Sequence, residues 1–102
     1  MPFAQAVPRP FHERGIWSFA PAAPGVFGLS NAKGWIHVAE TGDIRSALLD
    51  CLNGQDTGLL AHAPTGFVFE QCSVEVRKQR RLQLTMEYRP SHTPAADSGA
   101  RQ

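Results

Sequence analysis

The chain has 102 residues, of which 42% are hydrophobic and 19% charged, and its formal net charge is +1. This length fits one domain with short tails, and the near-neutral balance excludes a strongly electrostatic role for the whole molecule. There is no apolar run of the roughly 18 residues that a membrane span needs, no signal-peptide pattern, and no zinc-binding spacing of Cys51 and Cys72, so we expect a cytoplasmic protein with no membrane partner.

Prolines mark the edges of the domain. Five of the eight prolines lie within residues 1–24, where they disfavour helix and the interior of a sheet. We therefore assign residues 1–23 to a proline-rich arm and residues 24–90 to the domain. Because the arm also carries apolar residues such as Phe11, Ile16 and Trp17, we expect it to lie, from about Phe11 onward, as an extended, partly packed cover. Residues 91–102 are small and polar, which predicts a disordered tail.

The first two elements of the domain form a predicted hairpin. Residues 25–30 and 35–40 read as strands, and residues 31–34 between them read as a turn. Asn31 and Gly34 favour this turn because both tolerate backbone conformations that other residues avoid.

A helix is predicted next, from Ile44 to Leu52. Thr41 or Asp43 can cap its start, and Gly54 can end it. A polar loop over residues 55–65 then leads to a third predicted strand over residues 66–72. The helix is supported by apolar residues at the spacing i, i+3, i+4, i+7 and i+8, which are Ile44, Ala47, Leu48, Cys51 and Leu52.

The last segment fits two patterns. From Leu82 to Arg89 apolar and polar residues alternate, which indicates a strand. Residues 75–88 are, however, mostly good helix formers, and Ser73 can cap a helix start. We predict a helix that ends before Pro90, because a known family has one here. The helix would place four residues on one face, namely Arg77, Arg81, Leu84 and Tyr88.

That family is identified from two tripeptides and their spacing. The sequence reads Gly-Val-Phe at 25–27, His-Val-Ala at 37–39, and then a polar turn at 40–44 that enters the first helix. With the proline that closes the last helix, this arrangement resembles the GIY-YIG nuclease superfamily over about residues 24–90. The resemblance implies an α+β fold, a small three-stranded antiparallel sheet flanked by helices, in the order β-β-α-β-α.

The residues at the family's catalytic positions differ from those of its nucleases. Those enzymes cut phosphodiesters with a metal ion held by a glutamate, with tyrosines that position and deprotonate water, and with an arginine that neutralises the phosphate. Here Phe27 and His37 stand in place of the tyrosines, Ala47 in place of the arginine, and Arg81 in place of the glutamate. Only His37 retains a proton acceptor, and Arg81 would repel a divalent cation. We therefore predict a degenerate site with no catalytic residue intact, no metal and no cofactor.

A basic run on the last helix is the remaining functional signal. Residues 77–81 contain four cations and no acid, and cations of this kind bind polyanions by releasing their counterions. The alternative is an ordinary solvated helix face. Our first hypothesis is a catalytically inert domain that binds nucleic acid or protein through this run and a groove around Phe27 and His37. The proposed nucleic-acid-binding residues are Arg77, Lys78, Arg80 and Arg81.

Two other functions stay open. The domain is alternatively a divergent endonuclease that hydrolyses DNA with His37 as base and with Mg²⁺ or Mn²⁺ held by Glu40 or Glu70. It is otherwise a protein-interaction module that uses the proline- and aromatic-rich arm.

Overall fold

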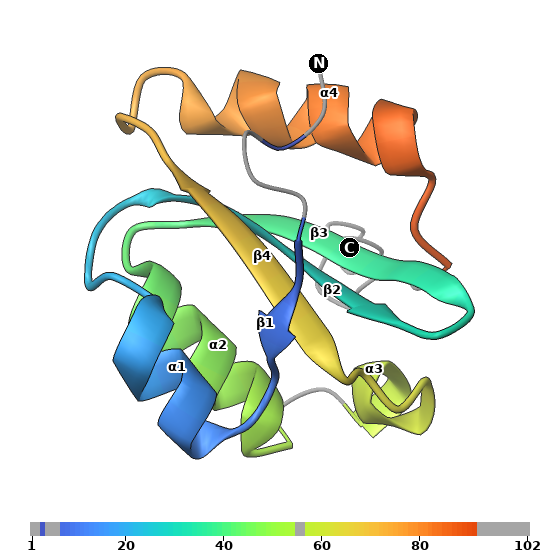
Figure 1. Ribbon diagram of the computed structural model, residues 1–102. Coiled ribbons are helices and arrows are strands. Elements are labelled where there is room, and N and C mark those ends of the chain that lie inside the picture. The colour runs from blue at the N-terminus through green and yellow to red at the C-terminus, as the bar shows by residue number, and fades with distance from the viewer. Residues whose placement is uncertain (1–2, 4–6, 55–56, 92–102) are drawn as a thin grey trace.

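The computed structural model describes residues 3, 7–54 and 57–91, so the predicted disordered tail, from residue 92 onward, lies outside the described residues. One antiparallel sheet lies between helices on both of its faces (Figure 1). Its strand order is β1-β4-β2-β3. The strands are β1 (Arg9–Pro10), β2 (Gly25–Asn31), β3 (Gly34–Thr41) and β4 (Gly66–Gln71), and the helices are α1 (Glu13–Phe19), α2 (Ile44–Leu52), α3 (Thr57–Ala61) and α4 (Arg77–Tyr88).

The three predicted strands are confirmed, and β2 is the strand that joins the other two. In β2, Phe27 pairs with Ala39 of β3 and with Phe69 of β4. The hairpin turn forms as its residues predict, because Gly34 has a φ of +139° and the side chain of Asn31 accepts a hydrogen bond from the backbone of Lys33 at 2.8 Å. The sheet also has a fourth strand, β1, which pairs with β4. The sequence did not indicate it, because it is only two residues long.

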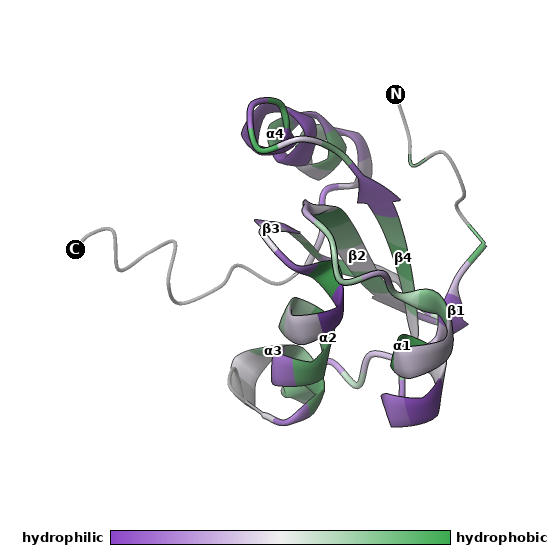
Figure 2. Ribbon diagram, turned by 90° about the vertical axis from the view of Figure 1, so that its left-hand side faces the viewer, coloured by the Kyte–Doolittle hydropathy of each residue, from purple (hydrophilic) through white to green (hydrophobic). Residues whose placement is uncertain are grey.

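Two hydrophobic cores lie on the two faces of the sheet, which Figure 2 shows on edge. Successive residues of a strand point to opposite faces. Phe27 and Leu29 accordingly join the core beneath α1, α2 and α3, whereas Val26 joins the core beneath α4. The second core is completed by Leu84 of α4 and by Phe3, which reaches it from the N-terminal arm.

The two predicted helices of the domain are confirmed. The carboxylate of Asp43 caps α2 by accepting a hydrogen bond from Ser46 N at 3.0 Å, and Gly54 follows the helix with a φ of +88°. Residues 82–88 are helical, so the strand pattern of alternation was misleading. The predicted cap by Ser73 is wrong. Helix α4 begins at Arg77, and no side chain caps it.

The arm differs from the expected extended cover. Residues 13–19 form α1, whose start is capped by the His12 ring, since Nδ1 accepts a hydrogen bond from Gly15 N at 3.1 Å. Phe11 and Ile16 are buried in the core beneath the sheet. Part of the predicted loop before β4 is also helical, as α3. None of the described helices combines the length and the apolar character needed to cross a bilayer.

Candidate functional site

Three of the four family positions lie together on the face of the sheet that α2 covers. Phe27 is only 2% exposed, and its ring centroid is 5.9 Å from that of His37, which is 6% exposed. Ala47 of α2 packs against the same core. Phe27 and His37 are thus part of the interior of the domain, and Ala47 is partly buried against it. The contact groove that we predicted around Phe27 and His37 is therefore closed by packing.

The fourth family position, Arg81, lies on the opposite face of the sheet, next to Glu40. In the β2–β3 register Glu40 pairs with Val26, so its side chain points to the face that α4 covers. Arg81 Nε donates a hydrogen bond to Glu40 Oε2 at 3.1 Å, and Arg77 Nε lies 3.6 Å from Glu40 Oε1. The structure therefore does not bring Arg81 together with Phe27 and His37.

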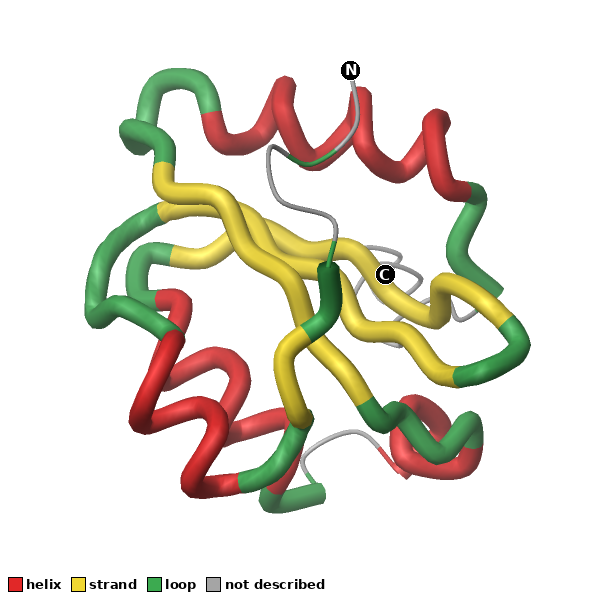
Figure 3. Tube along the Cα trace, viewed as in Figure 1, coloured by secondary structure: helices red, strands yellow, loops and turns green. Residues whose placement is uncertain are grey.

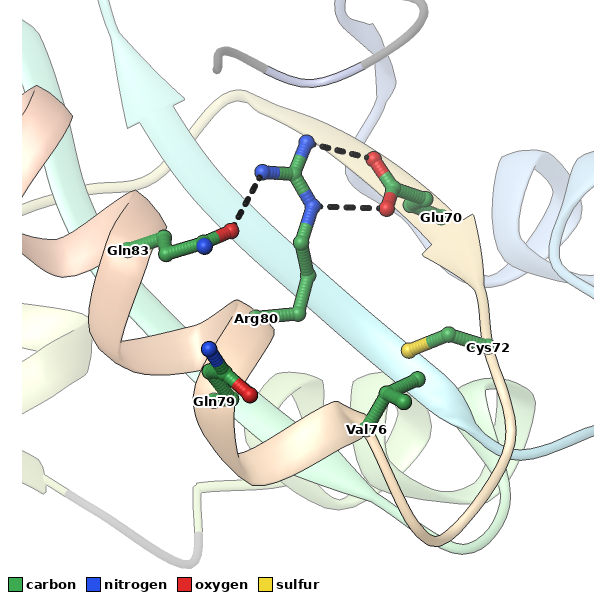
Figure 4. A pocket seen from close by; sticks show the side chains of 6 residues that line it. All are labelled: Glu70, Cys72, Val76, Gln79, Arg80 and Gln83. Atoms are coloured by element: carbon green, nitrogen blue, oxygen red, sulfur yellow. Dashed lines mark hydrogen bonds and ion pairs between the residues drawn. The ribbon is translucent and has the colours of Figure 1, made fainter.

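A second carboxylate, Glu70 of β4, holds Arg80. Arg80 Nε and Nη2 donate to the two carboxylate oxygens of Glu70 at 2.7 and 2.8 Å, and Nη1 donates to Gln83 at 3.3 Å (Figure 4). The hydrogen bond from Arg80 to Glu70 raises the pKa of the guanidinium above its ordinary value. Glu70 and Glu40 both pair with Val26, from its two sides. Glu40 and Glu70 thus lie on either side of Val26 on the face that α4 covers, and arginines of α4 form ion pairs with both carboxylates.

The basic run is consequently less available than its sequence indicates. Arg77, Arg80 and Arg81 each form an ion pair with a strand carboxylate, while Lys78 is exposed. Glu70 lies 10 residues before Arg80 in the sequence, and Glu40 lies 41 residues before Arg81. No local pattern in the basic run points to carboxylates at such distances.

The arrangement does not fit the divalent cation of the nucleases. Both oxygens of Glu40 face guanidinium groups, and a cation placed there would meet the charges of Arg77 and Arg81 at close range. Within residues 3, 7–54 and 57–91, no three side chains of His, Cys, Asp or Glu gather into a possible metal site. His37 also lies on the other face of the sheet from Glu40 and Glu70, so base and carboxylate do not converge on one water molecule.

A small pocket between β4 and α4 adds a thiol to this surface. It has a volume of about 270 Å³, and the side chains of Cys72, Glu70 and Arg80 are among those that line it (Figure 4). Burial, and then the negative charge of Glu70, raise the pKa of the Cys72 thiol above its ordinary value. The thiolate fraction near neutral pH is therefore small.

We expect Glu70→Gln to make Cys72 more reactive. The substitution removes a negative charge but keeps the cation of Arg80, so the pKa of the thiol falls and the thiolate fraction rises. The rate of alkylation by iodoacetamide at pH 8, measured in a Cys51→Ser background, should increase roughly two- to five-fold. Glu40→Gln is the matched control and should change the rate less, because Glu40 raises the pKa of this thiol less than Glu70 does. An unchanged or slower rate in Glu70→Gln would contradict the electrostatic account.

The fold resembles solved structures of one endonuclease domain. The GIY-YIG N-terminal endonuclease domain of UvrC from Thermotoga maritima, bound to its catalytic magnesium, matches with a TM-score of 0.68 and 19% identity, over 79% of this chain and 94% of that chain. Two point mutants of that domain, each bound to the divalent cation, match with TM-scores of 0.68 and 0.67 and identities of 19% and 20%, over 79% of this chain and 93% of theirs. No protein-family model and no curated protein sequence matches. The spacing of the two tripeptides and the agreement of the structures together establish that this chain has the GIY-YIG fold.

Proposed function

We propose that this domain binds nucleic acid without cleaving it, through Arg77, Lys78 and Arg81 at the N-terminal half of α4. The observation that carries the proposal is the guanidinium of Arg81. By the resemblance, Arg81 stands at the sequence position of the nucleases' metal-binding glutamate, and its Nε donates a hydrogen bond to Glu40 Oε2 at 3.1 Å. The similar solved domain is an endonuclease domain that binds a divalent cation. In this chain that sequence position carries a positive charge, on the opposite face of the sheet from Phe27, His37 and Ala47.

The ion pairs leave this surface positively charged and link its arginine side chains to the sheet. Two guanidiniums share the single carboxylate of Glu40, and each has five N–H donors, of which Glu40 engages only part. Charge-assisted hydrogen bonds from arginine to phosphate are among the stronger polar contacts. Because Glu40 already holds the arginine side chains, less conformational entropy is lost when a phosphate binds.

The same geometry argues against hydrolysis. The transition state of phosphodiester cleavage needs stabilisation of its developing charge and a base within hydrogen-bond reach of water. Phe27 and Ala47 offer neither group, and His37 is buried on the far face from the arginines. Binding without turnover is the function that these residues support.

Salt-titrated binding of a fluorescent DNA duplex tests the proposal. Arg77→Ala and Arg81→Ala should each weaken binding, and each should make the slope of log affinity against log salt shallower by about one. Arg14→Ala removes the same charge from the exposed side of α1 and is the matched control. Equal losses in all three variants, or no binding to any nucleic acid, would refute the proposal.

The endonuclease alternative is tested separately. Supercoiled, branched and single-stranded DNA, incubated with Mg²⁺ or Mn²⁺, should remain intact. Metal-dependent cleavage that disappears in His37→Ala, with the fold of the variant verified by circular dichroism, would establish a divergent endonuclease instead.

The arm offers less surface to a protein partner than its composition indicates. Phe11 and Ile16 are buried, whereas Trp17 and Phe19 are 54% and 43% exposed. Guanidinium groups lie over both exposed rings. That of Arg45 is 4.9 Å from the Trp17 ring centroid, and that of Arg9 is 4.5 Å from the Phe19 ring centroid. Such cation–π contacts hold α1 to its neighbours. The protein-interaction alternative would therefore rest on these two rings.

A further inference from the structure

A pocket of about 540 Å³ opens at the end of the domain where the β2–β3 hairpin turns. The chain after α4 returns to this hairpin, and α3 lies at the same end of the molecule (Figure 3). We call this cavity the hairpin pocket. The residues that matter for its chemistry are Asn31, Lys33, Trp35, His62, Tyr88 and Arg89.

Aromatic rings form one part of the hairpin pocket. The ring centroids of Trp35 and Tyr88 lie 4.4 Å apart with an angle of 43° between the ring planes. Phe3 stacks on both rings, at 5.9 and 5.7 Å, and its backbone N–H donates to the hydroxyl of Tyr88 at 3.1 Å. Trp35 and Tyr88 are thus supported from the core side and remain half-buried. Supported aromatic surface of this kind is suited to stacking with a planar base.

Two cations form another part. Lys33 lies in the hairpin turn and Arg89 ends α4, and both side chains are exposed. Within the part of the chain that the structure describes, neither forms an ion pair, and no acidic side chain lines the hairpin pocket. Arg77, Arg80 and Arg81 of α4, in contrast, each form an ion pair with Glu40 or Glu70. An anion in the hairpin pocket would meet two cations, and among the described residues that line the pocket no carboxylate offsets them.

Hydrogen bonds between the walls order the pocket. The side-chain amide of Asn31 donates to the backbone oxygen of His62 at 2.7 Å and accepts from Lys33 N at 2.8 Å. The backbone N–H of Ser91 donates to the oxygen of Trp35 at 3.2 Å. The hairpin is therefore tied both to the chain after α3 and to the chain after α4. A ligand would find the walls already in place.

Arg89 has an unfavourable backbone conformation. Its φ of 48° and ψ of 62° are left-handed, a region that favours glycine or asparagine at the end of a helix. Pro90 follows, and a residue before proline prefers an extended conformation. Arginine therefore stands here against the local backbone preference.

We propose that the hairpin pocket binds a nucleotide, with its phosphate held by Lys33 and Arg89 and its base against Trp35. The nucleotide is either free or the unpaired end of a strand, since both present the same phosphate and base. The proposal is independent of duplex binding by α4, because none of these three residues belongs to that surface.

Tryptophan fluorescence in a Trp17→Phe background, which leaves Trp35 as the sole tryptophan, tests the proposal with adenosine monophosphate, adenosine and inorganic phosphate as probes. We expect saturable quenching by the monophosphate and at least tenfold weaker binding of adenosine, which lacks the phosphate. Lys33→Ala and Arg89→Gly should each weaken binding of the monophosphate about three- to ten-fold. Arg14→Ala should leave it unchanged.

Arg89→Gly also guards against a false loss by unfolding. Because glycine favours a positive φ, the variant should keep or raise its melting temperature while it loses affinity. The proposal is overturned if the monophosphate fails to saturate at about 10 mM, or if Lys33→Ala and Arg89→Gly both bind it normally. Stronger binding of a phosphopeptide than of the monophosphate would also overturn it, in favour of a protein ligand.

The source of the nucleotide is decided by oligonucleotides. A thymidine oligomer with a 5′-phosphate that binds more tightly than the monophosphate, and more tightly than the same oligomer with a 5′-hydroxyl, indicates a strand end. Tighter binding of the free monophosphate indicates a small-molecule site. Lys78→Ala should reduce duplex binding and leave nucleotide binding intact, so failure at one surface is distinguished from failure at the other.

Discussion

Replacing Gly25 with alanine should lower the free energy of unfolding by about 3 kcal/mol or more. A Cβ atom at this position would lie 2.2 Å from the backbone oxygen of Glu70 and 2.8 Å from Cδ1 of Ile44. The oxygen belongs to the β2–β4 ladder, in which Gly25 pairs with Gln71, so relief of the clash requires the strands to separate. Urea unfolding followed by circular dichroism measures the loss.

Gly28→Ala is the matched control, because it adds the same methyl group to the same strand. Its Cβ would approach side-chain atoms only, those of Phe3 at 3.0 and 3.2 Å and of Trp35 at 3.3 Å. Side chains can move where a backbone ladder cannot, so we expect a smaller loss of about 1 kcal/mol. If Gly25→Ala destabilises the domain no more than Gly28→Ala, the steric account of the first tripeptide fails. If it holds, the glycine of that tripeptide is required by the fold, whether or not the domain is catalytic.

The elements that the sequence predicted are those whose signals are local. The turn at residues 31–34 depends on its own glycine and asparagine, and α2 depends on an apolar stripe and on Asp43, three residues before the amide that it caps. In these segments intrinsic preference and tertiary packing favour the same structure.

The elements that were missed depend on distant contacts. Strand β1 is two residues long and exists by pairing with Phe67 and Gly66. Helix α1 is capped by His12, a residue that is not among the usual N-cap residues, in a segment rich in proline. Its burial depends on a core that forms from residues much later in the chain, including Leu48 and Phe67.

One part of the candidate site was predictable and was overlooked. His37 and Glu40 are three residues apart on a predicted strand, and an odd separation places side chains on opposite faces. That alone separates the base of the endonuclease hypothesis from Glu40, one of its two candidate carboxylates. The pairing of Arg81 with Glu40 was not accessible in the same way, because it depends on how α4 crosses the sheet.

Leu84→Ala should cost about 3 kcal/mol of unfolding free energy and lower the melting temperature by about 10–20 °C. Leu84 is fully buried and packs among Phe3, Val26, Val38 and Val68, where truncation leaves a cavity between α4 and the sheet. No other described residue of α4 is buried, so the attachment of this helix depends strongly on one side chain. Differential scanning calorimetry measures the shift.

Leu82→Ala distinguishes the helix from the strand that the alternating pattern indicated. A strand would place Leu82, Leu84 and Met86 on one face and make their truncations similarly costly. In the helix Leu82 and Met86 are 47% and 77% exposed, so Leu82→Ala and Met86→Ala should each cost less than about 0.5 kcal/mol. Comparable losses at positions 82 and 84 would contradict the packing of α4 on the sheet through Leu84 alone. Such losses would also contradict the pairing of Arg81 with Glu40, on which the proposed nucleic-acid surface depends.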